Sequence, residues 1–476
     1  MDWYSDTFFH TRWLLKTGMA FIYLVAFASA WKQFCPLLGE NGLLPVPHFL
    51  KSRTFKDCPT LFHIGYTDKR FYVVCGLGLV LSALGLFGFL DSGPLCLSIA
   101  SWLILWFFYL SLVNVGQRFY GFGWETMLLE AGFLTSFLGS WKVAAPASII
   151  FCFRWMLFRV EVGAGLIKMR GDKCWKDLTC LEYHYETQPL PNPLSWHFHH
   201  LPKQFHKLSV AGSHVVQLVI PFGLFCPQPV AGWCAALMLV HQAWLIVCGN
   251  YSWLNWLTIV LCLSGMGDSF LGYPRAVVPT SVAFTILTTV ITLGVVYLSR
   301  DPVRNLLAKR QRMNTSYNAF RLVNSYGAFG SITKVRYEVV LEGTAEHFPA
   351  EDSWKEYHLP AKPVRTDRLP PQVAPYHLRL DWQMWFLPFS AQVVGTQVRV
   401  FRHEIWFQRL VECLLQGDHP VRKLFSHDPF PNSPPVFIRA RFYRYRYTSP
   451  AERQETGEWW HREPVGDYLS TCYLKD

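Results

Sequence analysis

The chain has 476 residues, of which 51% are hydrophobic and 16% are charged, and its formal net charge is +11 at pH 7. Soluble domains carry about 25% charged residues, so this composition argues against a soluble protein and indicates a membrane protein. An excess of Lys and Arg is then typical of basic loops at the bilayer surface. Because the chain has no basic-aromatic RNA-binding motif, we expect no nucleic-acid partner.

The first apolar run extends from Gly18 to Trp31 and follows Arg12 and Lys16. It lacks a small-residue cleavage site, so we interpret it as a signal-anchor helix. Further apolar runs continue to about Leu298, and a spanning helix needs roughly 20 such residues. The pattern predicts an α-helical polytopic membrane domain over residues 1–300 with about eight or nine membrane segments. The later runs are Phe71 to Leu90, Leu95 to Val115, Gly121 to Gly139, Ala147 to Met169, Val210 to Phe225, Val230 to Val247, Trp253 to Ser264 and Val277 to Leu298.

Ionisable residues interrupt two of these runs: Glu125 and Glu130 in one, and Arg154, Arg159 and Glu161 in another. Charges inside a membrane are costly and mark paired or functional positions. Arg159 and Glu161 are two residues apart and cannot face each other on one helix. We therefore expect intramembrane ion pairs between the two glutamates and the two arginines, in preference to a catalytic role.

Residues 170–208 form a polar stretch that has neither helical nor strand periodicity. It contains Cys174 and Cys180, followed by three prolines within five residues, from Pro189 to Pro193. Proline at that density predicts an extended path, whereas the many aromatic residues argue against disorder. We predict an ordered loop at the membrane surface. The two cysteines could form a disulfide in an oxidising compartment or remain reduced.

Histidines are concentrated in this loop: His184, His197, His199, His200 and His206. Zinc sites need His and Cys ligands at fixed short spacings, and no closing ligand is evident here. We expect these side chains to form hydrogen bonds with loop carbonyls, and we expect neither a metal nor a cofactor. Two glycosylation sequons occur, at Asn250 and Asn314. Asn250 adjoins an apolar run, so Asn314 is the better candidate.

Beyond a basic linker at residues 301–316, the sequence predicts a soluble, β-rich α+β domain over residues 317–476. Ile332 to Thr344 and Pro435 to Ser449 alternate in the manner of strands. Tyr376 to Phe386 is interpreted as a strand that runs into an aromatic patch. Apolar residues at helical spacing predict a helix over Phe401 to Leu415.

Several motifs resemble the lipase maturation factor family across nearly the whole chain. They are RGDKCWKDLTC (Arg170 to Cys180), HYETQPLPNPLSWHFHHLP (His184 to Pro202), LVNVGQRFYGFGWETMLLEAGFL (Leu112 to Leu134), GLLPVPHFL (Gly42 to Leu50), CGNYSWLNWLT (Cys248 to Thr258) and RLDWQMWF (Arg379 to Phe386). A fainter likeness, AGLIKMRGD (Ala164 to Asp172), is similar to the membrane core of vitamin K-dependent carboxylase-type proteins, whose motif carries a lysine where this chain has Lys168.

The resemblance implies a non-enzymatic membrane chaperone that assists the folding and dimer assembly of secreted lipases, in contact with membrane lipids. It also implies a multi-pass protein of the endoplasmic reticulum; a bacterial plasma membrane is the alternative. One functional alternative is a carboxylase-like enzyme acting through Lys168, although the nearby Arg170 and Lys173 favour an interfacial anchoring role for this lysine. A second is a lipid- or quinone-binding protein with a cavity near Glu125, Glu130 and Arg154. The absence of GxSxG argues against a hydrolase of the α/β type.

We expect the loop and the C-terminal domain to lie on one side of the membrane, in contact, and to present one exposed aromatic surface to a client. Strands with alternating Arg and Tyr could also add to a client strand. The loop residues assigned to this function are Arg170, Asp172, Trp175, His184, Tyr185, Glu186, Thr187, Gln188, His199 and His200. In the C-terminal domain they are Asp381, Trp382 and Trp385.

Overall fold

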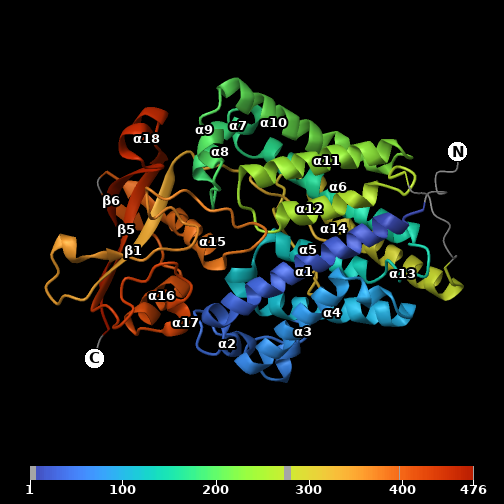
Figure 1. The fold of residues 1–476 in the computed structure, drawn as a ribbon, viewed down its shortest axis with the longest axis horizontal. Coiled ribbons are helices and arrows are strands. Elements are labelled where there is room, and N and C mark those ends of the chain that lie inside the picture. The colour runs from blue at the N-terminus through green and yellow to red at the C-terminus, as the bar shows by residue number, and fades with distance from the viewer. Residues whose placement is uncertain (1–6, 273–279, 396, 475–476) are drawn as a thin grey trace.

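A computed structural model describes residues 7–272, 280–395 and 397–474. Long helices of the first part of the chain pack side by side into a helical domain, and a β-sheet with short helices lies at one end of it (Figure 1). The expected start of the last membrane segment, Val277, lies outside the described residues.

Six helical stretches among the described residues are long and apolar enough to cross a membrane. They are α1 (Phe9–Leu38), α3 (Asp68–Leu86), α4 (Leu95–Val115), Lys203–Phe225 with α10 (Lys203–Leu218), α11 (Val230–Cys248), and Val282–Leu307 with α13 (Val282–Leu298) and α14 (Arg300–Leu307). Helix α1 begins before the predicted run and includes Lys16. The charge of Lys16 is compensated there, because its buried ammonium lies 2.5 Å from Oδ1 of Asp91.

Three further helices lie in the helical domain: α5 (Gly123–Thr135), α6 (Ala147–Arg170) and α12 (Leu254–Cys262). Nearly every residue of α5 is buried, and α6 also buries its charged residues Arg154, Arg159, Glu161 and Lys168. These helices are therefore surrounded by protein. In chain order, they and the six longer stretches correspond to the predicted apolar runs.

The loop at residues 170–208 is more regular than its sequence predicted. It forms three short helices, α7 (Lys173–Lys176), α8 (Leu181–Thr187) and α9 (Ser195–His199). The prolines from Pro189 to Pro193 separate α8 from α9, because proline cannot continue a helix. The stretches between prolines are too short for a helical period to be visible in the sequence.

The C-terminal part contains a four-stranded antiparallel sheet with the strand order β2-β1-β5-β6. Its strands are β1 (Arg336–Thr344), β2 (Lys355–Glu356), β5 (Phe437–Tyr447) and β6 (Trp460–Cys472). The predicted strands over Ile332 to Thr344 and Pro435 to Ser449 are thus confirmed. A separate hairpin consists of β3 (Ala391–Val394) and β4 (Gln397–Val400).

The predicted strand over Tyr376 to Phe386 is wrong, because Arg379–Phe386 forms the helix α15. Its buried apolar residues Leu380 and Met384, followed by Leu387, have the i, i+4, i+7 spacing of a helix. The helix predicted over Phe401 to Leu415 is confirmed as α16 (Ile405–Leu415). The other short helices are α2 (Val46–Leu50), α17 (His419–Arg422) and α18 (Pro450–Thr456).

The segment between α14 and β1 does not leave the helical domain as a simple linker. Asn324 and Tyr326 are buried, and Nδ2 of Asn324 lies 3.0 Å from Oε2 of Glu130 on α5. The chain after α14 therefore returns to pack against the helical domain before it enters β1.

Candidate functional site

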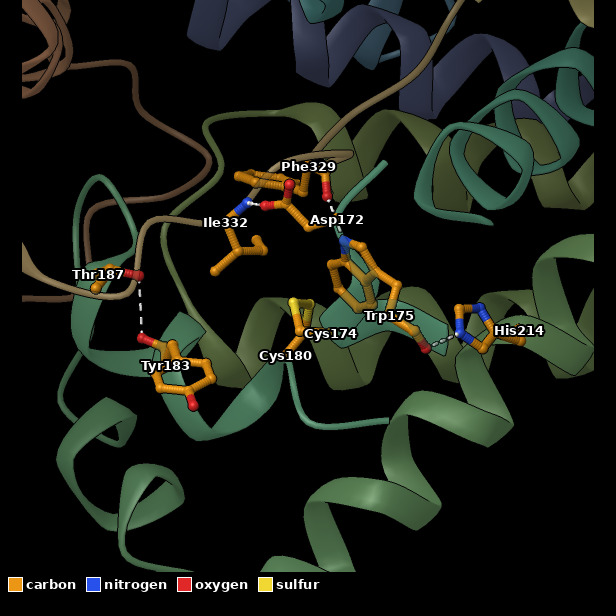
Figure 2. Close-up of a disulfide and its surroundings, with 9 residues drawn as sticks. All are labelled: Asp172, Cys174, Trp175, Cys180, Tyr183, Thr187, His214, Phe329 and Ile332. Atoms are coloured by element: carbon orange, nitrogen blue, oxygen red, sulfur yellow. Dashed lines mark hydrogen bonds between the residues drawn. A yellow bond between two sulfur atoms is a disulfide. The ribbon is translucent and has the colours of Figure 1, made fainter. Parts of the chain in front are cut away.

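The loop at residues 170–208 is fixed to the segment that precedes β1. Figure 2 shows the disulfide between Cys174 and Cys180 beside these contacts. The backbone N–H of Ile332 donates to the Asp172 carboxylate at 2.7 Å. The Trp175 indole donates to the carbonyl oxygen of Phe329 at 2.8 Å. These hydrogen bonds of Asp172 and Trp175 thus fix the loop to the segment that precedes β1.

The same loop contacts the C-terminal domain directly. The Trp196 indole donates to the carbonyl oxygen of Thr448 at 2.9 Å, and its ring packs against Trp459. The backbone N–H of Tyr447 donates to the Glu186 carboxylate at 2.8 Å. Segments in such contact must lie on the same side of a membrane.

Gln188 and Tyr251 connect the loop at residues 170–208 to the segment before α12. They lie where the loop, the helical domain and the C-terminal domain meet, a region that we call the junction. The Gln188 amide donates to the Ser195 hydroxyl at 2.8 Å, and its carbonyl accepts from the Tyr251 hydroxyl at 2.8 Å. The Tyr251 hydroxyl also lies 2.7 Å from Nε2 of His184. Burial lowers the pKa of His184 to about 3, so its imidazole is neutral at this position.

Asn250 is a further connection that the sequence did not reveal as structural. Its amide donates to the carbonyl oxygens of Pro191 and Pro371. Its own carbonyl accepts from the backbone N–H groups of Val373 and Ala374. The amide and the carbonyl of the Asn250 side chain are therefore both engaged in hydrogen bonds inside the protein. Asn314 of the other sequon is exposed.

The junction contains a partly open cavity of about 1130 Å³. Its walls come from α6, α10, α11, α12, the loop and α15. Lys168 and Glu161 of α6 line it and are both buried. The Lys168 ammonium donates to Oε1 of Gln217 at 2.9 Å and lies 4.8 Å from the centre of the Trp175 ring. The Lys168 ammonium is therefore held inside the protein by these contacts.

This cavity differs from the one expected near Glu125, Glu130 and Arg154, which do not line it. Those side chains are instead engaged within the protein. Arg159 forms an ion pair with Glu130, as expected for this pair of helices. Arg154 donates to the carbonyl oxygens of Ser264 and Leu224.

Glu125 pairs with a residue of the C-terminal domain that was not among the expected partners. The Arg379 guanidinium donates to Oε1 of Glu125 at 2.7 Å, and both side chains are fully buried. The same guanidinium donates to the carbonyl oxygen of Phe119 and lies 3.4 Å from the centre of the Tyr120 ring. This ion pair therefore joins the helical domain to α15.

The expectation of an exposed aromatic surface on the loop is wrong for its largest side chains. Trp175, Tyr185 and Trp196 are all less than 10% exposed. His184, Thr187 and Gln188 are buried as well, while Arg170 and His200 are exposed. Aromatic side chains minimise exposed apolar area, so they pack into the junction when neighbouring layers are available.

The three residues that we expected on the C-terminal surface also differ in exposure. Asp381 and Trp382 are buried, and Oδ1 of Asp381 accepts from the backbone N–H of Ala361 at 2.7 Å. Burial raises the pKa of Asp381 to about 7. Trp385 is partly exposed and donates to the carbonyl oxygen of Thr187 at 3.1 Å. Trp382, whose ring packs against Trp124, and Trp385 thus join the two domains, whereas Asp381 bonds within its own domain.

Nε2 of His199 lies 3.7 Å from Oε2 of Glu186, on the side of the loop that faces the sheet. Nδ1 of His200 lies 2.8 Å from the carbonyl oxygen of Trp196, and Nε2 of His206 lies 2.9 Å from that of Phe198. Among the residues that the structure describes, no group of His, Cys, Asp and Glu side chains is arranged to hold a metal ion.

Comparisons with known proteins agree with this two-part architecture. The family model of the lipase maturation factor transmembrane domain matches residues 10–273, and that of the lipase maturation factor C-terminal domain matches residues 322–470. The human protein "Lipase maturation factor 1" is 38% identical over 99% of this chain and 89% of its own length. The mouse protein of that name is also 38% identical, and chicken "Lipase maturation factor 2" is 29% identical over 98% of this chain and 82% of its own length.

No solved structure matches the chain. The two family models together cover most of the chain, in the order in which the structure places the helical domain and the sheet. The chain therefore belongs to the lipase maturation factor family and is a multi-pass α-helical membrane protein with a C-terminal domain that contains β-sheet.

Proposed function

We propose that this protein is a membrane chaperone of the endoplasmic reticulum that assists secreted lipases in folding and assembling into dimers. The observation that carries the proposal is the similarity to proteins named lipase maturation factor 1 over 99% of the chain. No catalytic role is proposed for Lys168, and no cofactor is needed for this function.

An apolar surface around the β3–β4 hairpin is the best place for client binding. Its side chains are all more than 40% exposed, unlike Trp175, Tyr185 and Trp196 of the loop. They are Phe386, Phe389, Val394, Phe401 and Ile405. We call this set the hairpin surface. The backbone N–H of Phe401 donates to the carbonyl oxygen of Ser390 and closes the hairpin. Exposed apolar patches of this kind suit the apolar surface of a partly folded client.

Strand addition to the Arg- and Tyr-rich strand β5 is not possible in this fold. β5 is an inner strand that pairs with β1 on one side and β6 on the other. Within the described residues, β3 pairs only with β4. Strand β3 therefore offers an edge beside the hairpin surface to which a client strand could add.

The double variant Phe389→Ser/Phe401→Ser tests client binding by the hairpin surface. Burying a large apolar side chain contributes about 1.5–3 kcal/mol, and about 1.4 kcal/mol corresponds to a tenfold change in affinity. We expect at least tenfold less lipase to co-purify with the variant, and a parallel loss of secreted lipase activity from cells that depend on it.

Phe348→Ser is the matched control, because Phe348 is 96% exposed and lies outside the hairpin surface. This control should support lipase secretion like the parent. The double variant must also unfold at the parent's temperature for its loss to be assigned to binding. Normal lipase secretion from cells that carry only the double variant would contradict the proposed surface.

Location in the endoplasmic reticulum can be tested with the cysteines of the junction. If the loop and the C-terminal domain face the lumen, Cys174 and Cys180 share an oxidising compartment in which a disulfide persists. In sealed microsomes, an impermeant maleimide should label none of Cys174, Cys180 and the partly exposed free thiol Cys472. After permeabilisation it should label Cys472, and it should label the pair only after reductant is added. Labelling of Cys472 in sealed microsomes would place the domain in the cytosol.

A further inference from the structure

The cavity at the junction contains an acidic group with an unused acceptor. Glu161 is 1% exposed and lines the cavity. Its Oε1 accepts from the Gln242 amide at 2.7 Å. Its Oε2 has no hydrogen-bond partner of good geometry in residues 7–272, 280–395 and 397–474, although the Gln217 side chain lies near this carboxylate. A buried polar atom without a partner costs free energy, so a ligand group that donates a hydrogen bond would be stabilised here.

A basic group stands on the same helix, seven residues further along α6. The Lys168 ammonium uses one of its three donors on Gln217 and can donate to another acceptor. Lys168 and Glu161 are also close enough to interact electrostatically. An ionised ligand would add an uncompensated charge inside a low-dielectric site, which is costly. The site therefore favours a ligand that is neutral and carries both a donor and an acceptor.

Most of the remaining wall of the cavity is apolar, and the exposed side chains Arg170, Lys309 and Arg310 line it as well. Val160, Ala164 and Ile167 of α6 face it, together with Trp244 of α11 and Trp382 of α15. Towards its exposed end it is lined by Phe386 and Phe389, which are 42% and 51% exposed. The volume of about 1130 Å³ is large enough for a lipid-sized molecule.

We infer that this cavity binds a neutral lipid with a free hydroxyl group. The hydroxyl donates to Oε2 of Glu161 and accepts from the Lys168 ammonium, and the hydrocarbon part lies along the apolar wall. Diacylglycerols and sterols share this chemistry. The cavity shares Phe386 and Phe389 with the hairpin surface, but its occupancy can be measured without any lipase.

The first test compares lipids that remain with the purified protein in the parent and in two variants. Ala164→Phe places a ring in the cavity, whereas Gly212→Phe on α10 places the same ring at a position with no neighbouring atom within 4 Å. The bound lipids are extracted and identified by mass spectrometry. We expect about one hydroxyl-bearing neutral lipid per protein for the parent and Gly212→Phe, and at least tenfold less for Ala164→Phe.

A second test uses photoreactive diacylglycerol and photoreactive cholesterol as separate probes, which distinguishes the two sources. Labelled peptides should come from α6 or α11. Glu161→Leu should weaken labelling about tenfold, because losing a buried hydrogen bond to this side chain costs enough for such a change. Equal retention in Ala164→Phe and Gly212→Phe would overturn the proposal. So would recovery of an anionic lipid in the cavity, or a parent protein that carries no lipid and labels with neither probe.

Discussion

Glu130→Gln will destabilise the folded protein by about 3–5 kcal/mol, the usual cost of leaving a buried charge without its partner. The partner is Arg159, which is 1% exposed and forms an ion pair with Glu130 inside the helical domain. The same carboxylate accepts from the backbone and side chain of Asn324 and from the hydroxyl of Tyr326. We expect a lower unfolding temperature in detergent and a lower yield of monodisperse protein.

The double variant Glu130→Gln/Arg159→Met should recover part of this loss, because it removes the uncompensated charge as well. Glu351→Gln is a suitable control, since Glu351 pairs with Arg439 on the surface and surface pairs contribute little. Its unfolding curve should match that of the parent. A Glu130→Gln protein that also melts like the parent would show that the buried pair does not hold the helices together.

Arg379→Met will separate the C-terminal domain from the helical domain, with a loss of about 3–5 kcal/mol in the stability of the junction. The substitution leaves Glu125 buried without its guanidinium partner. It also removes the hydrogen bond to Phe119 and the packing on Tyr120. Limited proteolysis should then cut the segment between α14 and β1 at a protease concentration that leaves the parent intact.

Arg379→Met/Glu125→Gln should restore part of the resistance to protease, because it removes both buried charges and leaves neither without a partner. Arg368→Met controls for the loss of an arginine, since Arg368 is exposed in the same domain. If Arg379→Met resists protease like this control, the Glu125 pair does not dock the domain.

Much of the membrane part could be predicted from the sequence, because the length of an apolar run reports directly on the thickness of a bilayer. The alternation that predicted β5 is likewise local, with Ile438, Ala440 and Phe442 buried on one face. Helix α15 was missed because its apolar spacing is mixed with tryptophans and phenylalanine that fit a strand equally well. Tertiary packing decided between the two.

The sequence by itself determined that charges within the apolar runs need partners and that the aromatic loop needs a surface to pack on. It did not determine which partners these are. Arg379 is 254 residues from Glu125, and Asn324 is 194 residues from Glu130. The cost of burying a charge is local and visible in the sequence, whereas the identity of the group that compensates it depends on how helices and sheet pack. The cavity beside Lys168 and Glu161 follows from the same packing, because it is the space that α6, α11 and α15 leave between them.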